Sequence, residues 1–419
     1  MVSRYNRRLL TAPSSRILCL CLAVTVIAAP ARAADEEDAP AATPPSAQTD
    51  VGDLWRKLRD KEPAAEDQRS KVVIVTPSIG SKPSTGLNAG VAGHVAFFLG
   101  DPDTTHISTL VGGLKVSTKK QALGNIRFAT FSDHDRWFFQ GDNRLSRTSQ
   151  DTYGIGGDTL ATDAENMKFN LRRFYETAYR SVKAGLFVGV GLNVSHYSDV
   201  RPGTGAQTTW GQSEYVTYNL NHGFAVEQQT SSGTSIGLIY DTRDNAINPQ
   251  RGVLASASYR TFYEGFLGGD STWQGLYVDA RTYKTLTKDA RHKLAFWFLG
   301  DLVTGGTAPY MDLPSTAVDE RSARGYGEGR YRGEHLLYGE VEYRGALTSS
   351  GLVGIVAFLN TSTVDNTESG QRLFESFAPG VGFGFRILLN KRSKTNLCSD
   401  FGWGKNGSRG FYLAIQDTF

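Results

Sequence analysis

The residues with the most obvious chemical potential form a short glycine-flanked serine motif. Gly233-Thr234-Ser235-Ile236-Gly237 matches the nucleophile elbow of serine hydrolases. That elbow needs a strand, a sharp turn and a helix, whereas the residues after Ser235 predict a strand followed by a turn. No His or Asp stands out as a partner for Ser235. A strand flanked by glycines is therefore the better interpretation.

The sequence also gives little evidence for a metal site or a phosphate-binding loop. The seven histidines are scattered without the spacing of metal ligands. They are His94, His106, His134, His196, His222, His292 and His335. Gly325-x-Gly327-x-Gly329 is rich in glycine, but it does not join a strand to a helix as a phosphate-binding loop does. We therefore expect a protein that is not an enzyme and that needs no cofactor or metal.

The N-terminus has the features of a cleavable export signal. A lead-in with four arginines precedes a 13-residue apolar run, Ile17 to Ala29. Ala31-Arg32-Ala33 then offers the small-x-small pattern of a signal-peptidase site. An apolar run this short is typical of a signal peptide and not of a transmembrane helix. Residues 1–33 are therefore predicted to be a signal peptide.

The charge of the chain changes when this segment is removed. The 419 residues contain 45 Lys and Arg against 42 Asp and Glu, and residues 1–33 carry five Arg and no acid. The mature chain would have 40 basic and 42 acidic residues, a net charge of −2. This balance argues against a nucleic-acid partner. Cys398 would be the only mature cysteine, so no intramolecular disulfide is expected.

Residues 34–70 are predicted to be a periplasmic tether. The segment opens with acidic residues, continues with Ala, Pro, Thr and Ser, and contains one short helical candidate, Val51 to Lys61. Leu54, Trp55 and Leu58 would give this helix a small apolar face. A mostly flexible linker is favoured, because about 11 residues rarely form a stable isolated helix. The segment is also too short for a domain with its own core.

From Lys71 onward the apolar residues repeat with a period of two. In the stretch from Gly185 to Ser195, for example, Leu and Val alternate with Gly, Phe, Asn and Ser. Each such stretch has about the length of a tilted membrane-crossing strand. A soluble sandwich would bury its apolar face within a smaller domain. Residues 71–419 are therefore predicted to be an all-β, transmembrane antiparallel β-barrel of about 16 strands, closed because lipid cannot satisfy an open edge.

The strands of this barrel can be assigned approximately from the alternation. The candidates are Val72–Lys82, Asn88–Leu99, His106–Ser117, Leu123–Ser132, Trp137–Ser146, Lys168–Ser181, Gly185–Ser195, Thr234–Asp241, Val253–Tyr263, Thr272–Leu286, Lys293–Val303, Leu336–Leu347, Leu352–Thr361, Phe377–Leu389, Thr395–Gly402 and Gly410–Phe419. Gly305 to Gly333 is the longest connection in the second half, and its length indicates a functional loop.

One connection carries a specific turn sequence. Asp241-Thr242-Arg243-Asp244-Asn245 is followed by Pro249 and Gly252. Asp and Asn bind nearby backbone, Pro fixes φ and Gly permits a left-handed turn, so a structural turn accounts for these residues. The run also resembles the periplasmic turn of the BamA/TamA-like superfamily of outer-membrane assembly barrels, the bacterial surface antigen family.

Further motifs support this resemblance in the expected order. Ala323-Arg324-Gly325-Tyr326 is similar to the family's loop tip, although Ala323 replaces the usual branched residue. Gly339 to Arg344 resembles the strand after that loop, and Cys398 to Gly402 resembles the penultimate strand with its inward Asp. Thr76 to Gly80 resembles the opening strand. The chain also ends on an aromatic C-terminal signal, Phe419, although Asp417 stands where many barrels carry an aromatic residue.

The resemblance implies a specific contact inside the barrel. In the family the long loop folds inward and its Arg binds an inward acidic residue. Carried over, Arg324 would bind Asp400, with Glu340 or Glu342 as a second acceptor. Strand parity agrees with this contact, because both glutamates lie on the face opposite Val341. An exposed loop cation is the alternative interpretation of Arg324.

The resemblance covers residues 71–419 and implies a member without the periplasmic polypeptide-transport-associated domains, which cannot fit into residues 34–70. It implies a protein of the bacterial outer membrane that inserts or moves client proteins or lipids at a lateral seam. The expected partners are outer-membrane lipid, client outer-membrane proteins and periplasmic factors bound through residues 34–70. Pro77 and Gly410 would weaken pairing at the seam, unless Pro77 sits at a strand end. The alternative function is a passive pore or structural barrel without insertase activity.

Overall fold

The computed structural model describes residues 48–59, 71–82, 86–203, 209–317, 321–417 and 419. The predicted signal peptide, residues 1–33, lies outside the described residues, as do residues 34–47 and 60–70 of the predicted tether. Among the described residues, no helix is long and apolar enough to cross a membrane.

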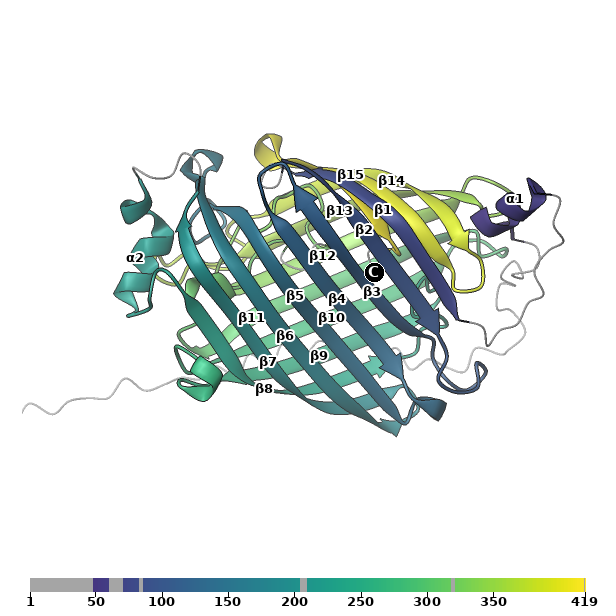
Figure 1. The fold of residues 1–419 in the computed structure, drawn as a ribbon, viewed down its shortest axis with the longest axis horizontal. Helices are drawn as coiled ribbons and strands as arrows, with labels where there is room; N and C mark the ends of the chain where they lie inside the picture. The colour runs from purple at the N-terminus through teal and green to yellow at the C-terminus, as the bar shows by residue number, and fades with distance from the viewer. Residues whose placement is uncertain (1–47, 60–70, 83–85, 204–208, 318–320, 418) are drawn as a thin grey trace, which may run out of the picture. The chain divides into compact units, whose positions relative to one another are not determined.

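From residue 71 onward, the described strands form one antiparallel sheet in which each strand pairs with the next strand in the chain (Figure 1). The strands are β1 (Val72–Lys82), β2 (Gly86–Phe97), β3 (Ser108–Ser117), β4 (Ala122–Phe131), β5 (Trp137–Thr152), β6 (Glu165–Lys183), β7 (Leu186–Pro202), β8 (Gln229–Asp241), β9 (Gly252–Phe262), β10 (Trp273–Thr285), β11 (His292–Gly306), β12 (His335–Ala346), β13 (Val353–Val364), β14 (Ala378–Asn390), β15 (Thr395–Gly404) and β16 (Arg409–Ile415). This arrangement confirms the prediction of an all-β barrel of about 16 strands.

Helices are few and short in the described part of the chain. The α-helices are α1 (Val51–Lys57) and α2 (Glu214–Asn221). The 3₁₀ turns are η3 (Asp133–Asp135), η4 (Ala161–Asp163), η5 (Trp210–Gln212), η6 (Phe266–Gly268), η7 (Tyr310–Asp312) and η8 (Lys405–Gly407).

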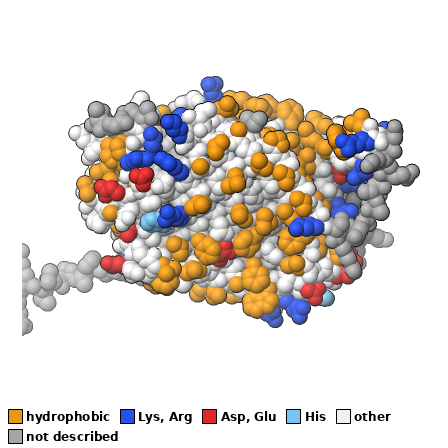
Figure 2. All heavy atoms as spheres, viewed as in Figure 1, with side chains coloured by type: hydrophobic (Ala, Val, Ile, Leu, Met, Phe, Trp, Pro, Cys, Tyr) orange, Lys and Arg blue, Asp and Glu red, His pale blue; other side chains and the backbone are white. Residues whose placement is uncertain are grey.

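Side chains alternate between the two faces of the sheet, as the period of two predicts. In β14, Val381, Phe383 and Phe385 are exposed outward, whereas the intervening glycines and Arg386 are buried. On the face seen in Figure 2, hydrophobic side chains are spread over the middle of the wall, and most charged side chains lie toward its edges. Apolar residues therefore face outward and polar residues face the lumen.

Several strands run further than the alternation predicts. Strand β5 continues to Thr152 and β6 begins at Glu165, and these two residues pair with each other. Strand β7 likewise continues to Pro202. The extension of β5, Arg147 to Thr152, is polar on both faces, so hydrophobic alternation cannot reveal it. The extensions of β6 and β7 contain the buried residues Met167, Tyr197 and Val200, but the β6–β7 register shifts there and Asp199 has a φ of +56°, so the period of two is interrupted.

The last strand is shorter than predicted. It ends at Ile415 and does not reach Phe419. Gln416 adopts a φ of +87°, which takes the chain out of the strand. Asp417 and Phe419 are both buried. The prediction that the strand continues to an aromatic C-terminal residue was therefore wrong.

The two ends of the sheet are β1 and β16. Strand β1 has 11 residues and pairs with β2, whereas β16 has 7 and pairs with β15. Over the residues that the structure describes, no ladder joins β1 to β16. Pro77 lies in the middle of β1, opposite Val91, and not at a strand end. The sheet is therefore a nearly closed barrel with a seam between its first and last strands.

Helix α1 is anchored to the barrel, although the sequence favours a flexible linker in this region. Asp50 caps the helix by accepting from Asp53 N at 2.8 Å. The same carboxylate accepts from Lys391 N at 3.0 Å, in the turn between β14 and β15. Lys391 Nζ lies 3.1 Å from Asp53 Oδ2. These contacts supply the stability that a helix of 7 residues lacks on its own.

A histidine clip joins two other turns and provides a pH-dependent prediction. His106 Nδ1 lies 2.5 Å from Asp135 Oδ2, and His106 N donates to Asp135 Oδ1 at 2.8 Å. The Asp135 hydrogen bond raises the pKa of His106 above its usual value. Protonated His106 therefore stabilises the folded barrel, and this contribution is fully present below the unfolded-state pKa of about 6.5. It is lost as the pH rises through the higher pKa of the folded state. We expect the barrel's melting temperature to fall over that pH range.

Thermal unfolding across the same pH range tests this clip, with His106→Gln as the comparison. The pH dependence should flatten in His106→Gln. Identical profiles in the two proteins would show that this pair does not contribute.

Candidate functional site

The long connection between β11 and β12 folds into the barrel. Arg324 is only 2% exposed, and Tyr326 and Tyr331 are also buried. Their rings lie in a cluster that includes Trp297 and Tyr338 from the barrel wall. The tip of the loop therefore packs against the inner face of the sheet.

Arg324 meets three carboxylates on that inner face. Its Nη1 donates to Asp400 Oδ2 at 2.6 Å, and its Nη2 donates to both Glu340 and Glu342. The guanidinium carbon also lies 3.6 Å from the centre of the Phe358 ring. The structure thus brings together the four charged residues that the resemblance links, and both glutamates are acceptors at once. The buried guanidinium excludes the alternative of an exposed loop cation.

The Arg324 contact belongs to a larger charged network, which we call the wall cluster. Arg386 Nη1 donates to Asp400 Oδ1 at 2.5 Å, and Arg344 Nε donates to Glu342 Oε1 at 2.5 Å. The cluster consists of Arg324, Arg344, Arg386, Glu340, Glu342, Asp400 and Asp417, all of them buried. Burial alone would lower the pKa of Arg324, but the three carboxylates around it hold that pKa well above its usual value. The three arginines and four carboxylates alternate, so each charged group contacts at least one group of opposite charge, and removing one would leave others buried and uncompensated.

Three glycines allow the loop tip to lie against β15. Gly325 has a φ of +112°, and a Cβ built on it would lie 2.8 Å from the carbonyl carbon of Trp403. A Cβ on Gly402 would lie 2.7 Å from Gly325 N, and one on Gly404 would lie 2.5 Å from the Tyr326 ring. Backbone and ring thus meet at distances that only glycine permits.

We expect Gly325→Ala to lower the free energy of unfolding of the barrel by about 1–3 kcal/mol, the usual cost of holding a residue with a side chain in a strained backbone conformation. The overlap with Trp403 adds to that cost. Urea unfolding of the detergent-solubilised barrel measures the change. Gly327→Ala is a matched control, because nothing lies within 4 Å of a Cβ at Gly327. Equal stability of the two variants would contradict the close packing.

The loop tip also binds the last strand. Gly325 N donates to Tyr412 Oη at 2.9 Å, and Ser408 Oγ donates to Gly325 O at 2.7 Å. Tyr326 Oη donates to Pro379 O at 2.5 Å. A Cβ on Gly410 would lie 2.4 Å from Tyr412 Oη, so this glycine provides space for that side chain. The tip therefore connects β12, β14, β15 and β16 on one side of the seam.

The C-terminal residues enter the lumen and join the wall cluster. Asp417 accepts from Arg386 Nε at 2.6 Å and from Asn396 Nδ2 at 2.8 Å. Burial alone would raise the pKa of Asp417, but the neighbouring guanidinium groups, Arg386 above all, hold it below its usual value. The Phe419 ring lies 5.1 Å from that of Trp297, and its main-chain oxygen accepts from Arg344 Nη2 at 2.6 Å. The sequence did not predict that Asp417 and Phe419 bind inside the barrel. The alternation along β14 predicts only that Arg386 lies on the inner face.

The turn between β8 and β9 is held by its own side chains. Asp241 accepts from Arg243 N at 3.0 Å and from Arg243 Nη2 at 2.7 Å. Asn245 Oδ1 accepts from two backbone N–H groups, and Asp244 Oδ1 from two more. Gly252 has a φ of +102°. The oxygen of Pro249 accepts from Lys293 Nζ, which extends from β11. The turn is thus tied to the barrel wall.

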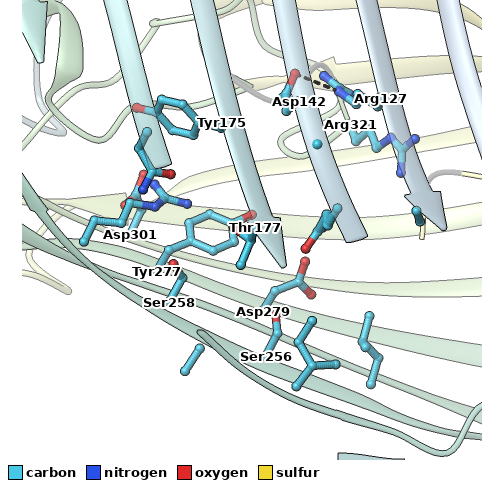
Figure 3. Close-up of a pocket in the computed structure, with 18 of the residues that line it drawn as sticks. Arg127, Asp142, Tyr175, Thr177, Ser256, Ser258, Tyr277, Asp279, Asp301 and Arg321 are labelled. Carbon is cyan, nitrogen blue, oxygen red and sulfur yellow. Dashed lines mark ion pairs between the residues drawn. The ribbon is translucent and has the colours of Figure 1, made fainter. Parts of the chain in front are cut away.

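The rest of the lumen holds a cavity of about 420 Å³ with charged walls. Figure 3 shows Arg127 and Asp142 paired on one side, with Tyr277 and Asp279 among the residues on other strands. An acid followed two residues later by Arg recurs around the barrel, because a period of two places both on one face. These pairs are Asp142–Arg144, Asp241–Arg243, Asp279–Arg281 and Glu342–Arg344. The inner wall therefore largely neutralises its own charge.

The candidate catalytic and metal motifs have ordinary structural settings. Ser235 lies within β8, opposite Gly191 and Arg260, and not at a strand-to-helix turn. Glu334, His335 and Asp365 bring possible ligand atoms within 4.8 Å of one another, a grouping that chain spacing did not indicate. His335 Nδ1 lies 2.5 Å from Asp365 Oδ2, so an ordinary hydrogen-bonded pair accounts for two of these residues.

Comparisons with known proteins agree with this geometry. Residues 98–403 match the Omp85 superfamily domain, and the chain therefore belongs to the Omp85 superfamily. Barrels of this superfamily reside in the bacterial outer membrane. No curated protein sequence matches the chain.

Solved structures show the same fold at low sequence identity. BamA from Haemophilus ducreyi lacking POTRA domains 1–3 is 14% identical with a TM-score of 0.52, over 83% of this chain and 69% of that one. CdiB from Acinetobacter baumannii is 12% identical with a TM-score of 0.51, over 83% of this chain and 59% of that one. CdiB from Escherichia coli is 10% identical with a TM-score of 0.53, over 84% of this chain and 63% of that one. The chain thus spans 59–69% of the length of these proteins.

Proposed function

We propose that this chain is an assembly or translocation barrel that inserts or moves client proteins or lipids at the seam between β1 and β16. The observation that carries this proposal is the lack of a ladder between these strands over the described residues. Backbone groups without partners in lipid are costly, so an incoming strand could gain hydrogen bonds there. Barrels of the superfamily handle client proteins in the outer membrane, which supports the same function.

The wall cluster would hold one side of the seam while the other side moves. Contacts of the loop tip reach Glu340 on β12, Asp400 on β15 and Tyr412 on β16. The strands from β12 to β16 are thereby braced from inside. Strand β1 could then separate from β16 without disturbing this bracing.

A passive pore is the alternative function, and the contents of the lumen argue against it. The Arg324 loop and the residues around Phe419 occupy part of the lumen. A pore would need a continuous aqueous path, whereas these segments are fixed by buried ion pairs. We also propose that the protein is not an enzyme, that residues 1–33 direct its export, and that residues 34–70 form a periplasmic tether.

Site-specific photo-crosslinking in cells tests the proposal. A photoreactive residue at Val75 on β1 should capture outer-membrane proteins that mass spectrometry can identify. Ile236 on β8 is a matched control, because the two side chains are 66% and 65% exposed on the outer wall. Identical crosslinked products at both positions would contradict a specific seam.

A further inference from the structure

The apolar stripe of helix α1 is exposed along its whole length. Leu54 is 40% exposed, Trp55 57% and Leu58, which ends the helix, 79%; Val51 is also exposed. Their spacing of three and four residues places them on one face of the helix. The opposite side binds the barrel through Asp50 and Asp53, so the apolar stripe is turned away from that contact.

The anchors of α1 lie in turns that adjoin exposed apolar side chains of the barrel wall. Thr49 N donates to Ser350 O at 3.1 Å, in the turn after β12, and Lys391 follows β14. Exposed apolar residues precede both anchors, Leu347 in one turn and Ile387 in β14. Lys391 comes four positions after Ile387, which corresponds to about 10 Å along the membrane normal for a strand tilted by about 45°. Because the anchors are this close to exposed apolar side chains of the wall, we place α1 at the edge of the apolar belt, where interfacial helices bind.

The charge of the helix is also suited to a membrane surface. Arg56, Lys57 and Arg59 lie at its C-terminal end, where cations also complement the helix dipole. Arg56 is paired with Asp53, whereas Lys57 and Arg59 are exposed. The Arg59 guanidinium lies 4.4 Å from the centre of the Trp55 ring. An aromatic residue beside basic residues is typical of a segment in contact with lipid headgroups.

We propose that α1 is an interfacial helix that places Trp55 and Leu58 in the lipid leaflet next to β14, with Lys57 and Arg59 at the lipid phosphates. The occupant of the exposed stripe is therefore the membrane, which is continuous with the apolar belt of the barrel. This proposal requires the barrel to lie in a membrane, but not that it handles clients.

Depth-dependent quenching tests the proposal with the full-length mature protein. A fluorophore is attached at Leu58→Cys in a Cys398→Ser background, since Cys398 would be the only other cysteine. The labelled barrel is reconstituted into vesicles of phosphatidylethanolamine and phosphatidylglycerol that contain brominated acyl chains. We expect strong quenching by these lipids and weak quenching by aqueous iodide. A label at Gln140→Cys in β5, on the inner side of the wall, is the control for quenching without lipid contact.

Each outcome decides between occupants of the stripe. If iodide quenches the Leu58→Cys label as strongly as free dye, the stripe faces water or awaits a protein partner, and the proposal is overturned. In a third outcome, the label in the reconstituted barrel is protected from iodide but is not quenched by brominated lipid. A second copy of the barrel then covers the stripe, and the proposal is also overturned. Heat-modifiable gel migration of each variant confirms that the barrel has folded. Because vesicles contain no client, failure here leaves the seam function standing.

Discussion

Arg324→Ala should lower the free energy of unfolding of the barrel by about 3–5 kcal/mol, the usual cost of removing one partner from a buried ion pair. The substitution leaves Glu340, Glu342 and Asp400 without the guanidinium that they share. It also removes the contact with the Phe358 ring. Urea titration of the detergent-solubilised barrel, followed by heat-modifiable migration, measures the loss.

Two further variants separate the effect of charge from that of geometry. Arg324→Lys should rescue poorly, because an ammonium group cannot reproduce a planar fork that reaches three carboxylates. Arg330→Ala is the matched control in the same loop. Arg330 is buried, donates to the neutral hydroxyl and carbonyl oxygens of Thr159 and lies over the rings of Tyr153 and Tyr331, and within the described part of the chain it has no ion pair with a carboxylate. Equal losses for Arg324→Ala and Arg330→Ala would show that the wall cluster has no special importance.

Phe419→Ala should release the C-terminal residues from the lumen. The ring is 4% exposed and packs beside Trp297, Tyr283 and the Arg344 guanidinium. Truncating such a buried Phe costs up to about 3–5 kcal/mol, and the cost is limited here by the free energy needed to undock the segment. The release should appear as faster carboxypeptidase digestion together with a lower urea midpoint.

The control for this variant is Phe374→Ala, because Phe374 is 61% exposed. It should leave both measurements unchanged. The C-terminal residues should also stay docked at neutral pH. Because the pKa of Asp417 is lowered in the folded barrel, its contribution to stability is fully present above about pH 4. That contribution is lost only as the pH falls through the folded-state pKa. Slow digestion of Phe419→Ala would contradict the docking of these residues.

Much of the barrel follows from local sequence. A period of two identifies the strands where one face meets lipid, and the same parity places Glu340, Glu342 and Asp400 on the inner face. The end of β5 cannot be found in this way, because its residues are polar on both faces. The ends of β6 and β7 are missed because a register shift and the positive φ of Asp199 interrupt the period of two. The contact of Arg324 with these carboxylates could be predicted only from the family resemblance. The alternation of side chains along a strand does not show where a long loop folds.

Other features depend on partners far away in the chain. The inward turn at Gln416 is stabilised by Asp417 with Arg386, and nothing around residue 417 reveals that Arg386 lies beside it. Helix α1 is too short to persist alone, and it is stabilised by Lys391, 341 positions after Asp50. Local propensity therefore predicts a linker, whereas the folded barrel supplies the contacts that order the helix.

Disulfide locking of the seam is the most direct test of the proposed function. Cysteine pairs join an outward position of β1, Val73 or Val75, to Phe411 or Leu413 of β16 in a Cys398→Ser background. Several pairs are needed, because no ladder sets the register between these strands over the described residues. A deletion strain that carries the locked barrel should lose the wild-type outer-membrane protein content, and a reductant should restore it. Locked barrels that support a fully wild-type outer membrane would contradict lateral opening and leave the passive barrel.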